Sequence, residues 1–464
     1  MTPDYSTWPF NVMPGEIPTD PEALRSWMRE RDIDEVECLT CDLAGIARGK
    51  AMPANKFAEM RSNYLPVSIY YQSITGDYAD LDRDDEWTET DMCLVPVLST
   101  LRTVPWAKYP TLQVIHDLQH QDGTPVGMAP RSVLKRVVDC YHALGLKPIV
   151  APELEFYLTK KNTDPDYPLE PPVGRSGRQS VGKQSYSMAA VDEYEMVIND
   201  IYDFAESMGL EIDTIIQEGG AAQLEINLIH GDPVELADQV FVFKRLIREA
   251  AFRQGCYATF MAKPMDHEPG SAMHIHQSLV SLETGENVLS DGDGKPSELF
   301  YQFLAGQQSY IPAAMCIFAP YVNSYRRMVI GGAAPINLEW GQDNRSVGLR
   351  IPHSSPANRR VENRVIGADT NPYLSIAASL ACGYLGIVEK LKPRKECTGI
   401  AYDADYTLPR SLLEALNLLD ECPALEETLG KDFTDVYKII KRHEFEEFMA
   451  VISPWEREHL LLTV

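Results

Sequence analysis

Polar side chains recur two residues apart in four short segments of the sequence. The segments contain Glu153 and Glu155; Gln223, Glu225 and Asn227, with Glu218 a few residues upstream; His274 and His276; and Glu362 and Arg364. Side chains at i and i+2 of a β-strand project from the same face, so each segment is predicted to present its polar groups on one strand face. Carboxylate oxygens and imidazole nitrogens are ligands that bind Mg²⁺ or Mn²⁺. Converging carboxylates repel one another unless a cation lies among them, which favours a metal site over the alternative of solvated strand faces.

Arginines form a second group, between residues 326 and 364. They are Arg326, Arg327, Arg345, Arg350, Arg359, Arg360 and Arg364. A guanidinium group forms paired hydrogen bonds with phosphate or carboxylate, so a site that handles both a nucleotide phosphate and an acid would use such residues. Each arginine taken singly is equally compatible with a salt bridge to the surplus Asp and Glu. Together with the metal ligands, the arginines predict phosphoryl transfer to a carboxylate, although the sequence contains no Walker loop.

The overall charge and the distribution of apolar residues exclude some partners. The 464 residues contain 42 Lys and Arg against 68 Asp and Glu, a formal charge of -26, which argues against nucleic acid as a partner. The first residues lack the basic and apolar regions of a secretory signal, and the most apolar stretch, 373–388, is too short to span a bilayer. Nine scattered cysteines are typical of reduced thiols. We therefore expect a cytoplasmic protein with no membrane association.

Turn signals divide the chain into two predicted domains. Residues 35–50 indicate a strand, a glycine-containing turn and a second strand, whereas 73–104 is acidic and typical of a loop. The turn at 122–125 precedes a long helical pattern and is the best candidate boundary. The predicted domains are 1–125 and 126–464.

Helical periodicity alternates with strand-like alternation through most of the second domain. Helices are predicted near 21–31, 130–145, 191–208, 233–253, 298–315 and 372–391. Strands interleaved with helices, with one polar and one apolar sheet face, predict an α+β fold.

Five motifs resemble those of the glutamine synthetase family and occur in the family's order. They are Ala151-Pro152-Glu153-Leu154-Glu155-Phe156, Gly270-Ser271-Ala272-Met273-His274-Ile275-His276-Gln277-Ser278-Leu279, Asn323-Ser324-Tyr325-Arg326-Arg327, Asp343-Asn344-Arg345-Ser346 and Glu362-Asn363-Arg364. The resemblance extends over nearly the whole chain. It implies an N-terminal β-grasp domain and a catalytic domain with a curved antiparallel sheet and surrounding helices. It also implies a homo-oligomeric ring, a hexamer or a dodecamer, with active sites between adjacent subunits.

The same resemblance implies roles for individual side chains around ATP, the co-substrate, and two or more Mg²⁺ or Mn²⁺ ions. One cation would be bound by Glu155, Glu218 and Glu225, and another by Glu153, His274 and Glu362. Glutamate would be held by Arg327, Arg364 and Gly270, the transferred phosphate by Arg345 and Arg350, and ATP by His276, Ser278 and Arg360. Asp42 matches an aspartate that the family's N-terminal domain donates to the neighbouring subunit's nucleophile pocket, and a structural turn aspartate is the alternative.

Three departures from the family pattern narrow the predicted function. Ala333 stands where ammonia-using members have a glutamate that helps to deprotonate ammonium, and its small side chain leaves room for an alkyl chain on the nitrogen. Pro269 replaces an asparagine that helps to grip glutamate, and Ala357 replaces a lysine. Segments 400–406 and 455–458 resemble the γ-glutamylamine ligase branch of the family.

The resemblance and its departures predict an ATP-dependent ligase that joins the γ-carboxyl group of L-glutamate to a primary amine through a γ-glutamyl phosphate. A di- or polyamine such as putrescine is favoured. Its distal ammonium group would need a carboxylate, such as Glu339 or the acidic loop that contains Asp77, Asp80 and Asp82. The alternatives are a monoamine substrate, glutamine synthesis from ammonia, and a catalytically silent homologue that serves as a structural or regulatory ring.

Overall fold

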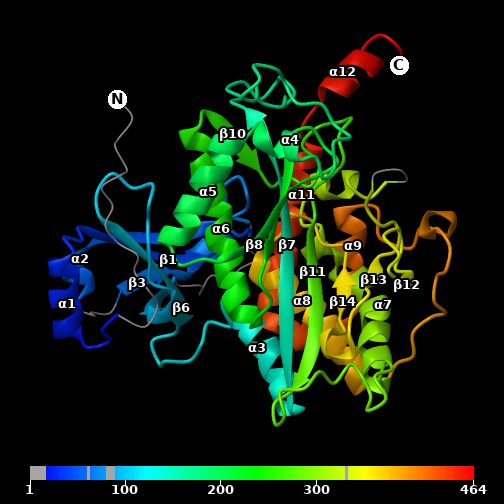
Figure 1. Cartoon of the computed structure of the whole chain (residues 1–464), viewed down its shortest axis with the longest axis horizontal. Coiled ribbons are helices and arrows are strands. Elements are labelled where there is room, and N and C mark those ends of the chain that lie inside the picture. The colour runs from blue at the N-terminus through cyan, green and yellow to red at the C-terminus, as the bar shows by residue number, and fades with distance from the viewer. Residues whose placement is uncertain (1–16, 60–62, 80–88, 330–332) are drawn as a thin grey trace.

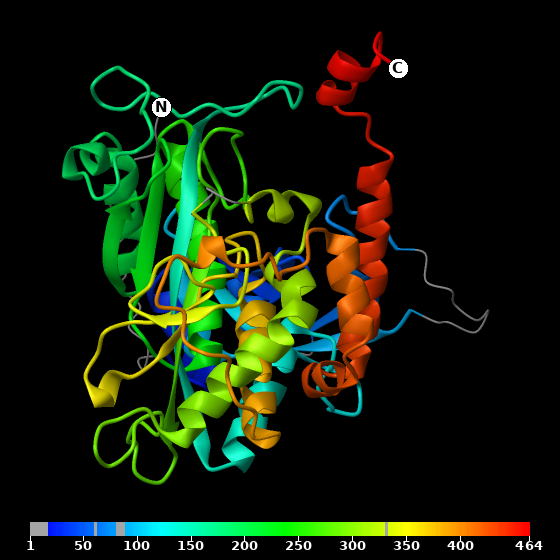
Figure 2. The ribbon, with the colours of Figure 1, turned by 90° about the vertical axis from the view of Figure 1, so that its right-hand side faces the viewer.

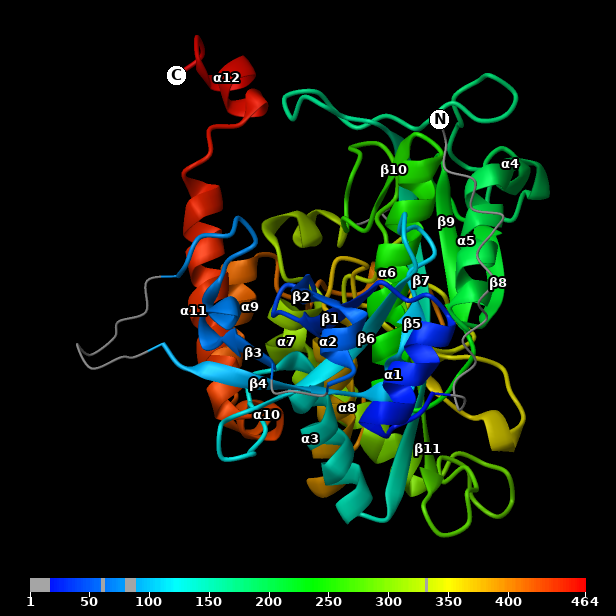
Figure 3. The ribbon, with the colours of Figure 1, turned by 90° about the vertical axis from the view of Figure 1, so that its left-hand side faces the viewer.

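Two sheets of different size lie side by side, and helices surround the larger sheet (Figure 1). The computed structural model describes residues 17–59, 63–79, 89–329 and 333–464. Figure 3 looks from the side of the smaller sheet, which lies in front of the long strands of the larger one. Figure 2 shows the opposite side, where helices from the C-terminal part of the chain, in orange and red, lie to the right of the green and teal elements.

The smaller sheet is built from segments near the N-terminus. Its strands are β1 (Glu35–Cys41), β2 (Ala47–Pro53), β3 (Asn63–Pro66), β4 (Asp91–Pro96), β5 (Arg102–Thr103) and β6 (Thr111–Gln119), in the order β2-β1-β6-β4-β3 with β5 on β6. β1 and β2 pair in antiparallel fashion, as predicted. The prediction of a loop throughout 73–104 is wrong, because β4 lies within that range. Met92 and Leu94 are buried on one face of β4, and the acidic residues before this strand masked the alternation.

The larger sheet carries all four polar segments. Its strands are β7 (Leu146–Lys160), β8 (Ile212–Gln217), β9 (Gln223–Leu228), β10 (Cys256–Thr259), β11 (Met273–Ser281), β12 (Trp340–Gln342), β13 (Leu349–Ile351) and β14 (Val361–Asn363). Their order is β12-β13-β14-β11-β7-β9-β8, with β10 on β7, and only the pair β12 and β13 is parallel in the described part. On β7, Leu154 and Phe156 are buried in the core, whereas Glu153 and Glu155 project from the other face.

Helices pack against both sheets. The helices are α1 (Pro21–Glu30), α2 (Ala54–Phe57), α3 (Pro130–Ala143), α4 (Met188–Asp192), α5 (Glu195–Ser207), α6 (Pro233–Arg253), α7 (Glu298–Phe318), α8 (Pro372–Val388), α9 (Leu412–Asp420), α10 (Pro423–Leu429), α11 (Lys431–Met449) and α12 (Pro454–Leu460). α2 contacts β1 and β2 of the smaller sheet, and α3 and α6 contact β7 of the larger one. α6 begins where Asp232 accepts hydrogen bonds from two backbone N–H groups, with Pro233 in the first turn. α8, the most apolar stretch of the sequence, is almost wholly buried and packs against α3, α6 and α7.

The α+β fold class is confirmed, with a curved sheet and helices around it. The smaller sheet ends before residue 120 and the larger one begins after residue 145. The domain boundary at residue 125 falls between them and stays a prediction. In the described ranges, no helix has the length and apolar character needed to cross a membrane.

Candidate active site

A cavity of about 360 Å³ opens on the polar face of the larger sheet. The predicted site residues in its lining are Glu153, Glu155, Glu218, Glu225, Gly270, His274, Arg327, Arg345, Arg350 and Arg364. Strand pairing explains this convergence, because Glu153 lies opposite His274 on β11 and Glu155 lies opposite Glu225 on β9. Three neighbouring strands therefore present one face to the same space.

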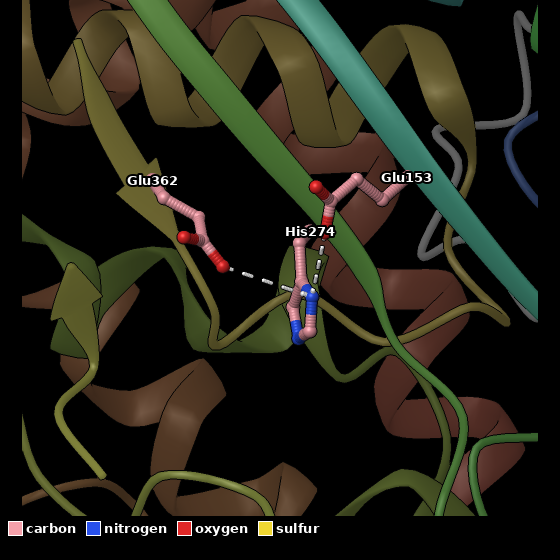
Figure 4. Close-up of side chains that lie close together, drawn as sticks. All are labelled: Glu153, His274 and Glu362. Carbon is pink, nitrogen blue, oxygen red and sulfur yellow. Dashed lines mark hydrogen bonds and ion pairs between the residues drawn. The ribbon is translucent and has the colours of Figure 1, made fainter. Parts of the chain in front are cut away.

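Glu153, His274 and Glu362 project toward one another from the adjacent strands β7, β11 and β14 (Figure 4). One potential ligand atom from each residue lies within 4.8 Å of the others. His274 Nδ1 is 3.3 Å from Glu153 Oε2 and 3.9 Å from Glu362 Oε1. Burial and the nearby Arg364 lower the pKa of His274 to about 4, so its imidazole is neutral at pH 7. Two carboxylates and a neutral imidazole are a donor set that fits Mg²⁺ or Mn²⁺.

Glu155, Glu225 and His274 form a second group whose potential ligand atoms lie within 4.8 Å of one another. Burial and the charge of Glu218 raise the pKa of Glu155 to about 8, and burial and the charge of Glu153 raise that of Glu225 to about 9. These carboxyl groups hold their protons firmly, but they ionise when a cation lies among them. Glu155, Glu225 and His274 therefore also fit a divalent metal ion. Glu218 lines the same cavity but lies outside the 4.8 Å group, whereas His274, predicted for one cation only, belongs to both groups.

Gly270 occupies a place where a side chain would not fit. A Cβ atom at this position would lie 2.5 Å from Arg327 Cγ and 2.6 Å from the carbonyl oxygen of Ala262. Gln223 Nε2 donates to the carbonyl oxygen of Gly270 at 3.0 Å and lies 3.2 Å from Glu155 Oε2. The glycine backbone, the Arg327 side chain and a candidate metal ligand are therefore fixed relative to one another.

Arg350 and Arg364 both pair with Glu362. Arg350 Nη1 lies 2.7 Å from Glu362 Oε2, and Arg364 Nη1 lies 2.6 Å from Glu362 Oε1. The Nε–H of each guanidinium group is buried and has no acceptor among the described residues. A buried donor without an acceptor is costly, so these two groups favour an anionic ligand in the cavity. Arg345 lines the cavity as a further cationic group.

His276, Ser278 and Arg360, the three residues predicted to lie along ATP, are not among the residues that line the cavity. Two of them are linked by hydrogen bonds to Glu153, which does line it. His276 Nε2 is 2.7 Å from Glu153 Oε1, and Arg360 Nε donates to His276 Nδ1 at 3.1 Å. Since Nδ1 accepts a hydrogen bond, neutral His276 carries its proton on Nε2, which faces Glu153. Ser278 lies farther along β11 and donates to the carbonyl oxygen of Arg359 at 2.8 Å.

Asp42 does not line the cavity of its own chain. It is buried directly after β1, and its Oδ1 accepts hydrogen bonds from the backbone N–H groups of Ala44 and Ile46, at 3.0 and 2.8 Å. Its Oδ2 lies 2.7 Å from Arg48 Nε. These contacts are those of a turn aspartate, which is the alternative that the sequence left open. Donation of Asp42 to a neighbouring subunit stays a prediction.

The acidic residues proposed to meet a distal ammonium group lie elsewhere. Glu339 is not among the lining residues, and its Oε1 lies 3.7 Å from Arg394 Nη2. Asp77 belongs to the exposed turn after Thr75, beside α11 rather than beside the cavity. Asp80 and Asp82 lie outside the described residues.

Two of the three departures from the family pattern lie in the cavity wall. Ala333 and Pro269 line it, whereas Ala357 does not. Ala333 has a φ of +61°, a left-handed conformation that few non-glycine residues adopt. The carbonyl oxygen of Pro269 accepts a hydrogen bond from the Tyr157 hydroxyl at 2.8 Å. Ala333 and Pro269 therefore change the shape and polarity of the cavity itself.

Sequence reasoning missed several lining residues. Gln223 and Asn227 share the face of β9 with Glu225 and belong to the same two-residue pattern, but no role in the site was predicted for them. Ser185 and Tyr186 line the cavity from the irregular segment before α4, where no periodic signal marks them.

Comparisons with known proteins agree with this arrangement. The family model described as glutamine synthetase, catalytic domain, matches residues 127–460. The γ-glutamylputrescine synthetase PuuA of Escherichia coli K12 is 36% identical over 447 residues, 95% of this chain and 94% of the relative. The glutamate–isopropylamine ligase of a Pseudomonas species is 32% identical over 93% of this chain and 96% of the relative. A solved structure of GmaS without ligand has a TM-score of 0.80 at 27% identity, covering 94% of this chain and 99% of that one. The chain therefore belongs to the glutamine synthetase family.

Proposed function

We propose that this protein is an ATP-dependent ligase that joins the γ-carboxyl group of L-glutamate to a primary amine, with a di- or polyamine such as putrescine as the favoured substrate. One observation carries the proposal. A single cavity contains clustered carboxylates and an imidazole together with the buried, acceptor-free Nε–H groups of Arg350 and Arg364. A cation-binding wall beside an anion-binding wall suits a reaction between ATP and an acid.

Two or more Mg²⁺ or Mn²⁺ ions per active site suit the donor sets. We assign Glu153, His274 and Glu362 to one cation, and Glu155, Glu218 and Glu225 to the other. When bound, such cations screen the phosphate charges of ATP and polarise the transferred group.

The remaining residues would bind and orient the substrates. Arg327 and Arg364 would hold the carboxylates of glutamate beside the Gly270 backbone, and Arg345 and Arg350 would stabilise the charge on the transferred phosphoryl group. The γ-carboxylate oxygen attacks the γ-phosphorus of ATP, the bond to the bridging oxygen breaks, and ADP leaves. His276, Ser278 and Arg360 would lie along the nucleotide.

The amine then attacks the carbonyl carbon of the γ-glutamyl phosphate, and inorganic phosphate leaves as the amide forms. The proton of the amine passes to a basic group or to water, and we propose Asp42 of a neighbouring subunit as the residue that positions or deprotonates the amine. Ala333 supports an amine larger than ammonia, since a methyl group there leaves space beside the reacting nitrogen. The relatives named for putrescine and isopropylamine support an alkylamine, charged-tail or neutral.

The assembly, the compartment and the domain division belong to the same proposal. We infer a homo-oligomeric ring of six or twelve subunits in the cytoplasm, with a β-grasp domain over residues 1–125 and a catalytic domain over 126–464. The support is the resemblance to the family and the position of Asp42 away from the cavity of its own chain.

Phosphate release with ATP, Mg²⁺ and L-glutamate, measured against a panel of amines, tests the proposed function. Release should require both glutamate and an amine, and putrescine and spermidine should react faster than phenethylamine, ethanolamine or ammonia. Equal or faster rates with the amines that lack a second charge would contradict the polyamine assignment. Ammonia as the best nucleophile would indicate glutamine synthesis, and no amine-dependent release would contradict ligation altogether.

A pair of arginine variants controls for general damage to the protein. Arg364→Met should abolish glutamate-dependent release, because it removes the buried guanidinium group of the cavity. Arg175→Met should leave release unchanged, because Arg175 is exposed and pairs with Asp192 and Glu195 on the surface.

A further inference from the structure

Asn227 lies on β9 at the place where the two proposed cation sites meet. It lines the cavity and shares its strand face with Glu225. In the sheet it is paired with Glu153 on β7 and with Thr214 on β8. Because Glu225 and Glu153 are proposed ligands of different cations, Asn227 is a neighbour of both sites.

The amide nitrogen of Asn227 is committed to two neighbours. Nδ2 lies 2.9 Å from Thr214 Oγ1 and 3.1 Å from Glu225 Oε1. When Glu225 is ionised beside a cation, its carboxylate only accepts hydrogen bonds, so the nitrogen of the amide, rather than its oxygen, faces Glu225. The bond to Thr214 fixes the amide from the opposite side. Asn227 therefore holds one oxygen of Glu225 in place.

The amide oxygen of Asn227, unlike its nitrogen, lacks a hydrogen-bond partner among the described residues. This oxygen, Oδ1, is buried. A buried acceptor without a donor is costly, so its presence in the wall of a cavity indicates a ligand that brings a donor. Glu153 and Glu225 cannot supply that donor when they are ionised around a cation. A water molecule bound to a divalent cation can, because the cation strengthens its acidity.

We propose that Asn227 is a positioning residue of the cation sites, which orients Glu225 through Nδ2 and accepts a hydrogen bond from a cation-bound water through Oδ1. This inference rests on the metal-binding part of the proposed function. Only a neutral amide performs both tasks, since an aspartate would add a like charge beside Glu153 and Glu225 and would lack the donor. Groups that hold metal ligands in this way typically change metal affinity 10–100-fold.

Mn²⁺ binding to the purified, assembled protein, followed by electron paramagnetic resonance without nucleotide, tests this role. Asn227→Ala should raise the Mn²⁺ dissociation constant by about 10–100-fold. In activity measurements, high Mg²⁺ should restore the kcat of this variant, because the defect lies in cation occupancy. Asn337→Ala is the matched control, since Asn337 is a buried asparagine outside the cavity whose Nδ2 donates to the carbonyl oxygen of Ala401 at 2.7 Å. The control should lower Tm and leave the Mn²⁺ constant unchanged.

The outcomes separate this inference from the proposed function. If the wild type binds Mn²⁺ tightly and Asn227→Ala has the same dissociation constant, the proposed role of Asn227 is wrong and the ligase proposal stands. A fall in kcat that Mg²⁺ does not restore also overturns that role. Absence of Mn²⁺ binding by the wild type overturns both.

Discussion

Arg364 Nη1 lies 2.6 Å from Glu362 Oε1, and both side chains are buried where β14 ends. The second oxygen of Glu362 pairs with Arg350, and the first also approaches His274. A single carboxylate therefore connects the cation-binding side of the cavity to its anion-binding side. Burial would raise the pKa of Glu362, but the positive charge of the Arg364 guanidinium group beside it helps to keep this pKa below its usual range.

Glu362→Ala should destabilise the fold as well as abolish activity. The substitution removes the ion-pair partner of the buried Arg364 guanidinium group, whereas Arg350 stays paired with Asp343, and we expect a loss of about 3–5 kcal/mol in the free energy of unfolding. Denaturant unfolding of the metal-free protein measures this loss. Glu195→Ala, at an exposed partner of Arg175, should cost less than about 1 kcal/mol. Equal losses in the two variants would show that the buried pairs do not act as described.

Gly270→Ala should impair glutamate use and also lower stability, because the added methyl group would lie 2.6 Å from the backbone carbonyl oxygen of Ala262. The added methyl group would lie 2.5 Å from Arg327 Cγ and displace this side chain, and a 1 Å displacement costs about 100-fold in catalysis. Steady-state kinetics with varied glutamate measure kcat/KM. Gly219→Ala is the matched control, because no atom would lie closer than 3.6 Å to its methyl group. If both variants lose activity equally, the contact with Arg327 is not the cause.

Ala333→Glu should shift the preferred nucleophile toward ammonia. The new carboxylate would project into the cavity, attract ammonium and fill the space that an alkylamine needs. Ratios of kcat/KM for ammonia and putrescine measure the shift. Ala333→Gln has similar size and no charge, and every one of these residues meets the same backbone strain at φ +61°. An equal gain with glutamine would exclude charge as the reason, and no gain with glutamate would refute the explanation of amine choice.

Lys244 should make stability depend on pH in the alkaline range. Its Nζ is fully buried and donates 2.7 Å hydrogen bonds to the carbonyl oxygens of Ala368 and Thr370. Burial and the charge of Arg248 lower its pKa to about 7, against about 10.4 in an unfolded chain. Between these values the unfolded chain binds a proton that the folded chain lacks. The contribution of Lys244 to the free energy of unfolding therefore rises with pH, by at most about 1.4 kcal/mol per unit, and is flat below about pH 7.

Lys244→Met should remove this alkaline rise. Denaturant unfolding of the wild type and the variant between pH 7 and pH 9 gives the difference in free energy, which should grow with pH in favour of the wild type. Lys431 is an exposed lysine 2.8 Å from Asp435, and the free energy of unfolding of Lys431→Met should change with pH as it does in the wild type. If the free energy of unfolding of Lys244→Met also changes with pH as it does in the wild type, Lys244 remains protonated in the folded protein.

Local signals in the sequence were sufficient for most elements. The prediction of a helix over 233–253 matches α6, because Asp232 caps its first turn, Pro233 follows and Gly255 comes just after its end. The two-residue spacing correctly placed Glu362 and Arg364 on one side, where they form an ion pair. It also brought His274 and His276 together around Glu153.

Relations between distant segments could not be read in this way. The two-residue spacing does not say that His274 lies opposite Glu153 or that Glu155 lies opposite Glu225, since strand order and register depend on the whole sheet; these groupings came from the family resemblance alone. The contacts of Asp42 with Ala44 and Ile46 depend on the detailed course of a turn, so its exclusion from the cavity of its own chain became visible only in three dimensions.

Strand β7 has Leu154 and Phe156 in the hydrophobic core and Glu153 and Glu155 in the cavity. A mutation that repacks the core beneath this strand also moves the carboxylates on its other face. Thermal stability and reaction rate should therefore change together at this strand. Ala333 belongs to an irregular segment instead, so a substitution there can change the cavity without repacking the core beneath β7. New amine preferences should therefore evolve or be engineered through such loops, while the strands keep the shared chemistry constant.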